Sequence, residues 1–154
     1  MHSSFLLVPG LLLWLNSFAY SQEKYPVRTG DTLFSGFDPV SYQAGEPSRG
    51  LEVFSLSHEG RIIKFCSPGN LKNFQKDKSR LLPAYGGWCA YSMSEGQFVK
   101  ANPGNYLLQD GRLFLFSSKA YLNALEKWQK APDINQIKAD QYYYIKYFPE
   151  AIRK

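Results

Sequence analysis

The chain has 154 residues, and its hydrophobic share of 44% with a charged share of 20% indicates one globular domain and excludes a chain that is disordered throughout. The formal net charge is +5, but Lys and Arg are spread along the chain without a long run, so we expect no nucleic-acid partner. The sequence contains no zinc-protease, nucleophile-elbow, C-x-x-C or phosphate-loop motif, so an enzyme is the less favoured class.

The first residues are typical of an export signal. Phe5–Leu15 is an apolar stretch of 11 residues, which is short for a membrane span. Ala19-Tyr20-Ser21 then fits the small-x-small rule for cleavage before Gln22. We therefore expect residues 1–21 to be a signal peptide and the mature protein to be periplasmic or secreted, with no membrane span. No Lys or Arg precedes the apolar stretch, so an uncleaved membrane anchor stays open as the alternative.

The mature chain divides into three parts. Residues 22–32 are polar at their start and are predicted to be flexible. Residues 33–148 contain the apolar patterns and are predicted to form one domain of ordinary size. Residues 149–154 then form a short C-terminal tail.

A β-hairpin is predicted around the turn Glu59-Gly60. A two-residue turn pairs Leu56 with Ile63, and it also pairs Phe54 with Phe65. All four side chains then lie on one face of the hairpin, and this agreement between the strands supports the register.

The hairpin is followed by a helix, because Ser67-Pro68 suits an N-cap and a first helical residue. The same hairpin–helix pattern returns 51 residues later around Asp110-Gly111, which indicates either internal duplication or convergence on one pattern. The later strands are apolar on both faces, so we expect this hairpin to lie centrally and to be covered on both sides. Ala84–Met93 is interpreted as a connector packed between the two units.

The C-terminal part is predicted to be helical from Asp133 to Phe148, with its apolar face packed on the sheet. The sequence therefore predicts an α+β fold, in which two β-hairpin–helix units surround a small antiparallel sheet and a C-terminal helix packs on it. The residues expected on the buried face of that helix are Ile134, Ile137, Tyr144, Ile145 and Phe148.

Four segments carry a joint pattern: G-F-D-P-V-S-Y at 36–42, F-C-S at 65–67, Y-G-G-W-C-A-Y at 85–91 and D-G-R-L-F-L at 110–115. Together they resemble exported proteins of the YHS domain family, which implies a YHS-like domain at residues 33–148. The family's domain also occurs in heavy-metal transporting ATPases and in monooxygenase hydroxylase subunits, and it is thought to bind metal. Its metal-type members resemble D-P-V-C followed by F-C-S-x-x-C, whereas here Ser41 and Asn70 stand at two of those cysteine positions. The resemblance therefore supports the fold more than it supports a metal site.

Cys66 and Cys89 are the two cysteines of the chain, and three interpretations stay open. An even number of cysteines in an exported protein suggests a disulfide. Two separate thiols that pack as small apolar residues are the second interpretation. The third is a soft-metal or redox site. Cys66 precedes a helix N-terminus, which favours its thiolate, and a helix over Gly87–Ser94 would place Cys89 and Met93 on one face as a thiolate–thioether pair that suits Cu(I).

His58 is not expected to join these groups, because it lies near the tip of the first hairpin, where we expect it to be exposed. The sequence therefore predicts an exported small binding module that takes a copper-like soft metal ion or a small ligand. Its candidate metal ligands are Cys66, Cys89 and Met93. A thiol-redox or other enzyme, and a structural accessory protein with a Cys66–Cys89 disulfide, stay open as alternatives.

Overall fold

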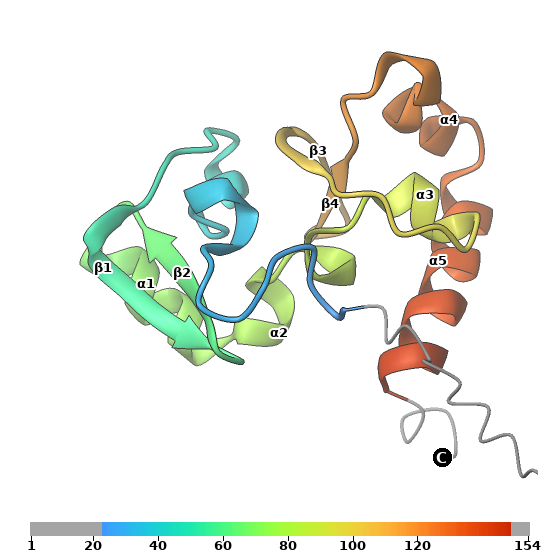
Figure 1. The fold of residues 1–154 in the computed structure, drawn as a ribbon. Coiled ribbons are helices and arrows are strands. Elements are labelled where there is room, and N and C mark those ends of the chain that lie inside the picture. The colour runs from blue at the N-terminus through green and yellow to red at the C-terminus, as the bar shows by residue number, and fades with distance from the viewer. Residues whose placement is uncertain (1–22, 149–154) are drawn as a thin grey trace, which may run out of the picture.

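The chain folds as an α+β protein in which two antiparallel two-stranded hairpins are packed with helices, and this confirms the predicted fold class. The structure is a computed structural model and describes residues 23–148 (Figure 1). The predicted signal peptide at 1–21, its cleavage position before Gln22 and the tail at 149–154 lie outside the described residues. Within residues 23–148, no helix has both the length and the apolar character that a membrane crossing needs.

Two groups of elements are visible in Figure 1, one around each hairpin, with α2 between them. The strands and α-helices are β1 (Leu51–His58), β2 (Arg61–Phe65), α1 (Pro68–Lys76), α2 (Lys78–Leu81), α3 (Ala90–Ser94), β3 (Asn102–Gln109), β4 (Arg112–Phe116), α4 (Ala124–Lys130) and α5 (Pro132–Tyr147). The 3₁₀ segments are η1 (Leu33–Gly36), η2 (Ser41–Ala44), η3 (Ala84–Gly87) and η4 (Ala120–Leu122).

Both hairpin turns lie where the sequence predicted them, at Glu59-Gly60 and Asp110-Gly111. The φ angle is positive at both central residues, 48° at Glu59 and 75° at Gly60 in the first hairpin, and 52° at Asp110 and 74° at Gly111 in the second. These are the angles of type I′ turns, whose twist matches that of the flanking strands. The two hairpins form two separate two-stranded sheets rather than a single sheet.

The strand register is as predicted next to the first turn and differs farther from it. Leu56 pairs with Ile63, but the predicted pairing of Phe54 with Phe65 is wrong, because Leu51 is the partner of Phe65. The register shifts through an irregularity between Leu51 and Ser55, which adds residues to β1. The second hairpin shifts its register at the corresponding place.

The correspondence between the two halves extends upstream of the hairpins. Both η1 and η3 contain three consecutive residues with positive φ. Directly after them, Phe37 forms an isolated bridge with Arg49, and Trp88 forms one with Lys100, at the same spacing of 51 residues. Ala84–Met93 is therefore the beginning of the second repeated unit, and its interpretation as a connector is corrected.

We call residues 33–76 unit one and residues 84–127 unit two. Each unit begins with a 3₁₀ segment and continues through a hairpin into a helical segment. One backbone hydrogen bond also recurs. The amide of the residue before each hairpin donates to the carbonyl oxygen of the last residue of the 3₁₀ segment, at 2.8 Å in unit one and 3.2 Å in unit two. The structure therefore supports the repeat that the sequence indicated.

The second hairpin was predicted to be covered on both sides, and this holds for β4, the most deeply buried strand, whereas β3 is mostly half-buried. The four side chains of residues 113–116 are at most 1% exposed, so both faces of this strand are covered. Trp128 of α4 packs against two of them, with its ring centroid 5.0 Å from that of Phe114 and 5.7 Å from that of Phe116. Burial of these large aromatic side chains is a main source of stabilisation for unit two.

α5 packs against α3. The face of α5 that is buried is opposite to the face that the sequence predicted to be buried. The buried residues of α5 are Asn135, Ala139 and Tyr143, which lie four residues apart along one side of the helix. Ala139 is small enough for close approach to a neighbouring helix, and the Asn135 amide donates to the carbonyl oxygens at the end of α4. The exposed apolar residues of α5 are Ile134, Ile137, Tyr142, Tyr144 and Ile145.

Part of the segment that precedes unit one packs against the two units, whereas the sequence predicted a flexible segment at residues 22–32. Tyr25 is 2% exposed and belongs to the core. The Trp88 indole of unit two donates to the carbonyl oxygen of Lys24, at 3.1 Å. Farther along, the Ile62 amide of unit one donates to the carbonyl oxygen of Asp31, at 3.0 Å. The segment therefore contacts both units.

Candidate functional site

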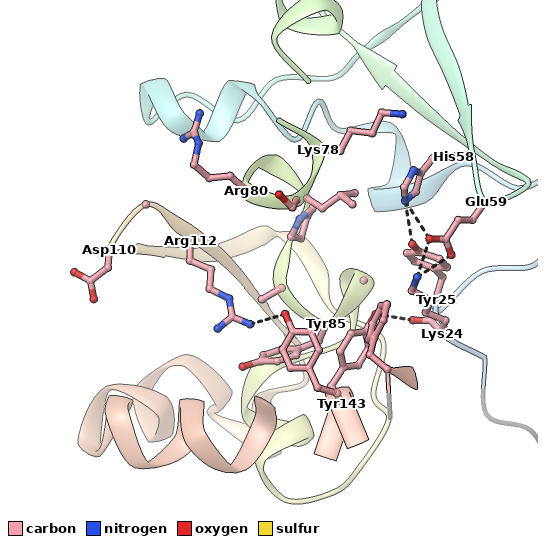
Figure 2. Close-up of a pocket in the computed structure, with 18 residues that line it drawn as sticks. Lys24, Tyr25, His58, Glu59, Lys78, Arg80, Tyr85, Asp110, Arg112 and Tyr143 are labelled. Carbon is pink, nitrogen blue, oxygen red and sulfur yellow. Dashed lines mark hydrogen bonds and ion pairs between the residues drawn. The ribbon is translucent and has the colours of Figure 1, made fainter. Parts of the chain in front are cut away.

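A cavity of about 590 Å³ lies between the two units, and we call it the inter-unit cavity. The turn of each hairpin reaches it, so it is lined by His58 and Glu59 from unit one and by Asp110–Arg112 from unit two. The remaining lining comes from the N-terminal segment, α2, η3 and the end of α5, and Figure 2 shows these side chains around the cavity. The cavity is therefore built by segments that are distant in sequence.

Three buried tyrosines form one side of the cavity, and we call them the tyrosine floor: Tyr25, Tyr85 and Tyr143. The rings of Tyr85 and Tyr143 meet edge to face, with centroids 5.6 Å apart. Burial raises the pKa of all three phenols above the ordinary value, so they are neutral near pH 7.

The tyrosine hydroxyls are held by protein groups. Tyr85 Oη donates to Asp140 Oδ1 at 2.9 Å, and Tyr143 Oη donates to the carbonyl oxygen of Lys24 at 3.4 Å. The floor therefore offers a molecule in the cavity mainly aromatic carbon rather than free hydroxyl groups.

His58 lies at one edge of the cavity, and the prediction that it is exposed is wrong. Its side chain is 14% exposed, and its Nε2 lies 3.1 Å from Tyr25 Oη. Burial is the main reason that the pKa of His58 lies below its ordinary value, and the nearby Lys24 and Lys78 add to this effect. Sequence reasoning missed this position because the turn of the first hairpin folds against the N-terminal segment.

Two cations of the cavity are paired with carboxylates and also cover aromatic rings. Arg112 makes a two-point ion pair with Asp140, at 3.0 and 2.7 Å, and its guanidinium lies 5.4 Å from the Tyr85 ring centroid. Lys24 pairs with Glu59 at 2.7 Å, and its ammonium lies 4.5 Å from the ring centroid of Phe148. These contacts use both the charge and the ring faces.

α2 contributes two further cations to the opposite side of the cavity. Arg80 pairs with Asp77 at 2.8 Å. Lys78 is exposed and, among residues 23–148, has no ion-pair partner within 4.0 Å. Figure 2 shows the ammonium end of Lys78 extending toward His58, whereas Asp110 points away from the tyrosine floor.

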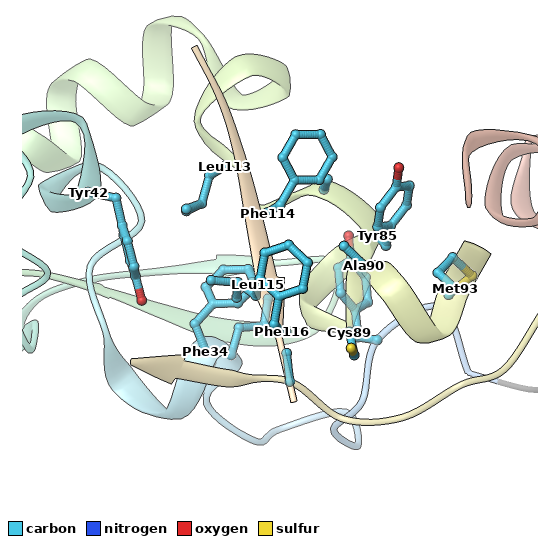
Figure 3. Packing of buried hydrophobic residues seen from close by; sticks show 14 of the residues in the cluster. Phe34, Tyr42, Tyr85, Cys89, Ala90, Met93, Leu113, Phe114, Leu115 and Phe116 are labelled. Atoms are coloured by element: carbon cyan, nitrogen blue, oxygen red, sulfur yellow. The ribbon is translucent and has the colours of Figure 1, made fainter. Parts of the chain in front are cut away.

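The structure places the predicted metal ligands at separate positions. Cys89 and Met93 are both completely buried in unit two, where Cys89 is the N-cap of α3. Figure 3 shows their side chains directed to different parts of the core. Cys66 is half-buried in unit one, and both cysteines are free thiols rather than a disulfide.

Cys66 belongs to a polar cluster around Asp38, whose side chain is completely buried. The Asp38 carboxylate accepts from the amides of Val40 and Cys66, at 2.8 and 2.9 Å, and from Asn70 Nδ2 at 2.7 Å. Burial and the Asp38 carboxylate raise the pKa of the Cys66 thiol. The expectation that the helix N-terminus favours a Cys66 thiolate is therefore wrong.

The repeat explains why the two cysteines have different surroundings. Cys89 lies 51 residues after Asp38, and Ser117 lies 51 residues after Cys66. The cysteines thus occupy different positions of the repeated unit, one in each copy. Across residues 23–148, no three side chains of His, Cys, Asp or Glu gather into a group that could hold a metal ion.

Comparisons of the chain with protein-family models, with curated proteins and with solved structures found no match. The functional interpretation therefore rests on the inter-unit cavity and on the surroundings of the cysteines.

Proposed function

We propose that this protein is an exported binding domain for a small organic molecule, which occupies the inter-unit cavity. The observation that carries the proposal is the tyrosine floor beneath a cavity of about 590 Å³. Ligand sites in proteins commonly have volumes of roughly 300–1,000 Å³, and they are mostly apolar with a few polar groups at their edges. The inter-unit cavity has both properties.

The polar groups of the cavity favour binding over catalysis. His58 Nε2 is already in contact with Tyr25 Oη, and Lys24 and Arg112 are each paired with a carboxylate. A general base needs a free lone pair within reach of the reacting proton. Groups that are already engaged with one another are poor candidates for a general base, so the cavity is better suited to binding than to catalysis.

The cavity is a better candidate site than the cysteines. A shared soft-metal site would need sulfur atoms that converge on one point. Cys66 instead contacts Asn70 Nδ2 at 3.2 Å in unit one, while Cys89 and Met93 are buried in unit two. The copper-like site of Cys66, Cys89 and Met93 stays a prediction that no observation of this structure favours.

A blocking substitution tests the proposed site. Ser79 lines the cavity and is exposed, so Ser79→Trp should fill part of the cavity without disturbing the core. Asn73→Trp, at an exposed position of α1 outside the lining, is the matched control. A panel of one- and two-ring aromatic compounds, with neutral, anionic and cationic members, would be screened against the full chain by ligand-observed NMR.

We expect some members of the panel to bind the parent protein and the Asn73→Trp variant, and to bind Ser79→Trp at least about tenfold more weakly. Failure of every compound to bind the parent, or equal binding to Ser79→Trp, would overturn the proposed function. Circular dichroism of both variants checks that they are folded.

A further inference from the structure

We infer that the molecule bound in the inter-unit cavity is a small aromatic acid, whose ring lies on the tyrosine floor and whose carboxylate pairs with Lys78. This inference rests on the proposed function, and it adds the chemical class of the ligand. It is carried by two independent features of the cavity, the nature of its floor and the placement of its charges.

The floor favours a flat aromatic body. Tyr85 and Tyr143 line the cavity, and their hydroxyls are already bonded to Asp140 and Lys24. Aromatic rings pack on one another in offset or edge-to-face geometry, with a gain beyond that of simple burial. A sugar or another molecule rich in hydroxyl groups would instead lose hydrogen bonds to water on such a floor.

Cations of the protein already lie near the aromatic rings of the cavity, which leaves ring edges for the aromatic body of a ligand and disfavours a cationic ligand. Besides Arg112 over Tyr85 and Lys24 over Phe148, the guanidinium of Arg61 lies 4.8 Å from the ring centroid of Tyr25. An incoming ammonium group would have to displace one of these cations or lie beside it. Either arrangement costs electrostatic energy at short range.

Two charged groups of the cavity lining, Lys78 and Asp110, have no ion-pair partner within residues 23–148, and Asp110 points away from the tyrosine floor (Figure 2). Glu59 is engaged by Lys24, and Asp140 is engaged by Arg112. Among the residues that the structure describes, Lys78 has no such partner, and it extends along the His58 edge (Figure 2). A carboxylate at this edge would supply the partner of Lys78, and a charge-assisted hydrogen bond there would fix the direction in which the ligand lies.

Three compounds of matched shape test the charge preference. 2-Naphthoate carries the carboxylate, 2-naphthamide is its neutral isostere, and 2-naphthylmethylammonium is the cationic counterpart. Binding of each to the full chain would be measured by isothermal titration calorimetry at pH 7.5 and fixed ionic strength. We expect 2-naphthoate to bind about tenfold more tightly than 2-naphthamide, and the cation to bind most weakly.

Two lysine variants locate the charge. Lys78→Met should weaken 2-naphthoate binding by about tenfold and leave 2-naphthamide binding unchanged, because the methionine keeps most of the aliphatic stem. Lys72→Met, on the exposed face of α1 outside the cavity lining, removes the same charge elsewhere and should leave both affinities unchanged. The imidazole NMR signal of His58 should also shift on addition of 2-naphthoate to the parent.

The outcomes separate this inference from the proposed function. If none of the three compounds binds while other members of the panel bind the parent and not Ser79→Trp, the assignment of an aromatic acid is overturned and the proposed function stands; if no member of the panel binds either, both fail. If 2-naphthamide or the cation binds as tightly as 2-naphthoate, the cavity is a ligand site but the assignment of an aromatic acid is overturned. If Lys72→Met weakens 2-naphthoate binding as much as Lys78→Met does, the pairing with Lys78 is overturned.

Discussion

At the scale of single residues, the side chain with the most demanding surroundings is Asp38. It is completely buried, and three donors converge on its carboxylate. One of these donors is the amide of Val40, two residues later, which is the local turn-forming bond that Asp commonly makes. A buried carboxylate of this kind fixes several chain segments at once, and its role here is structural.

Asp38→Ala is predicted to lower the free energy of unfolding by about 3 kcal/mol, because it leaves buried donors without an acceptor. The exposed Asp31→Ala is the control and should change it by less than about 1 kcal/mol. Urea denaturation followed by tryptophan fluorescence measures both. Equal midpoints for the two variants would contradict the assigned role of Asp38.

The two thiols are predicted to differ in reactivity. Cys66 is half-buried and Cys89 is completely buried, and both are free. A thiol-specific reagent should therefore modify only Cys66 in the native protein. It should modify both Cys66 and Cys89 after the protein is unfolded without a reductant. Mass spectrometry of the modified peptides identifies them. Finding neither cysteine modified in the unfolded, unreduced protein would instead show a disulfide.

His58 is predicted to make stability depend on pH in the mildly acidic range. Its pKa in the folded protein lies below the ordinary value of about 6.5, so the unfolded chain takes up the proton more readily. Stability should therefore fall as the pH is lowered from about 7.5 to about 5. The pKa of Glu59 is also lowered, so the stability that its ionised carboxylate contributes is lost only at more acidic pH.

Unfolding free energies at several pH values between 5 and 7.5 test this prediction, with His58→Gln as the comparison. The variant should show a flatter dependence on pH than the parent in this range. Parallel curves for the two proteins would mean that the imidazole is not the group responsible.

At the scale of elements, the positive-φ turns differ in what surrounds them. Gly111 in the second hairpin turn has φ of +74° and open space where a Cβ would lie, whereas Gly86 of η3 has φ of +63° in a crowded site. A Cβ at Gly86 would lie 2.8 Å from the carbonyl oxygen of Lys24 and 2.9 Å from atoms of Tyr25 and Tyr143. The glycine at position 86 therefore permits a positive φ and also the close approach of Lys24, Tyr25 and Tyr143.

Gly111→Ala is predicted to cost about 1 kcal/mol of stability from backbone strain alone. Gly86→Ala should cost about 1–3 kcal/mol more than that, because the strain is similar and the added methyl group also overfills the site. Thermal unfolding of the two variants gives the comparison. A smaller loss for Gly86→Ala than for Gly111→Ala would contradict the close packing of η3 against the N-terminal segment.

At the scale of the whole molecule, the N-terminal segment and α5 join the two units. Tyr25 approaches His58 of unit one and Gly86 of unit two. Arg112 of β4 and Tyr85 of η3 both bind Asp140 of α5. Figure 1 shows the N-terminal segment passing from beside α5 to the first unit, so the parts of the chain before and after the repeat complete the cavity.

Tyr25→Ala is predicted to lower the free energy of unfolding by about 3 kcal/mol, because it removes a buried aromatic ring that contacts both units. Tyr142→Ala, at a side chain that is 53% exposed, is the control and should have an effect of about 0.5 kcal/mol or less. Chemical denaturation measures both variants. A small effect of Tyr25→Ala would mean that the N-terminal segment is not part of the folded domain.

Local sequence was sufficient to predict the features that depend on neighbouring residues. Glu59-Gly60 and Asp110-Gly111 specify type I′ turns because their backbone must adopt positive φ, and Ser67-Pro68 specifies a helix start. The apolar residues on both faces of β4 likewise specified a strand covered on both sides. These features need little information from distant parts of the chain.

The remaining features depend on contacts between distant segments, and they emerged only in the folded chain. α5 has apolar residues on more than one side, and the neighbouring α3 selected the side with Ala139 and Tyr143. The burial of Tyr25 and His58, and with it the inter-unit cavity, depends on how the two units face each other. Local patterns do not contain this information, because packing between segments more than 30 residues apart is governed by the shapes and hydrogen-bonding groups that meet there.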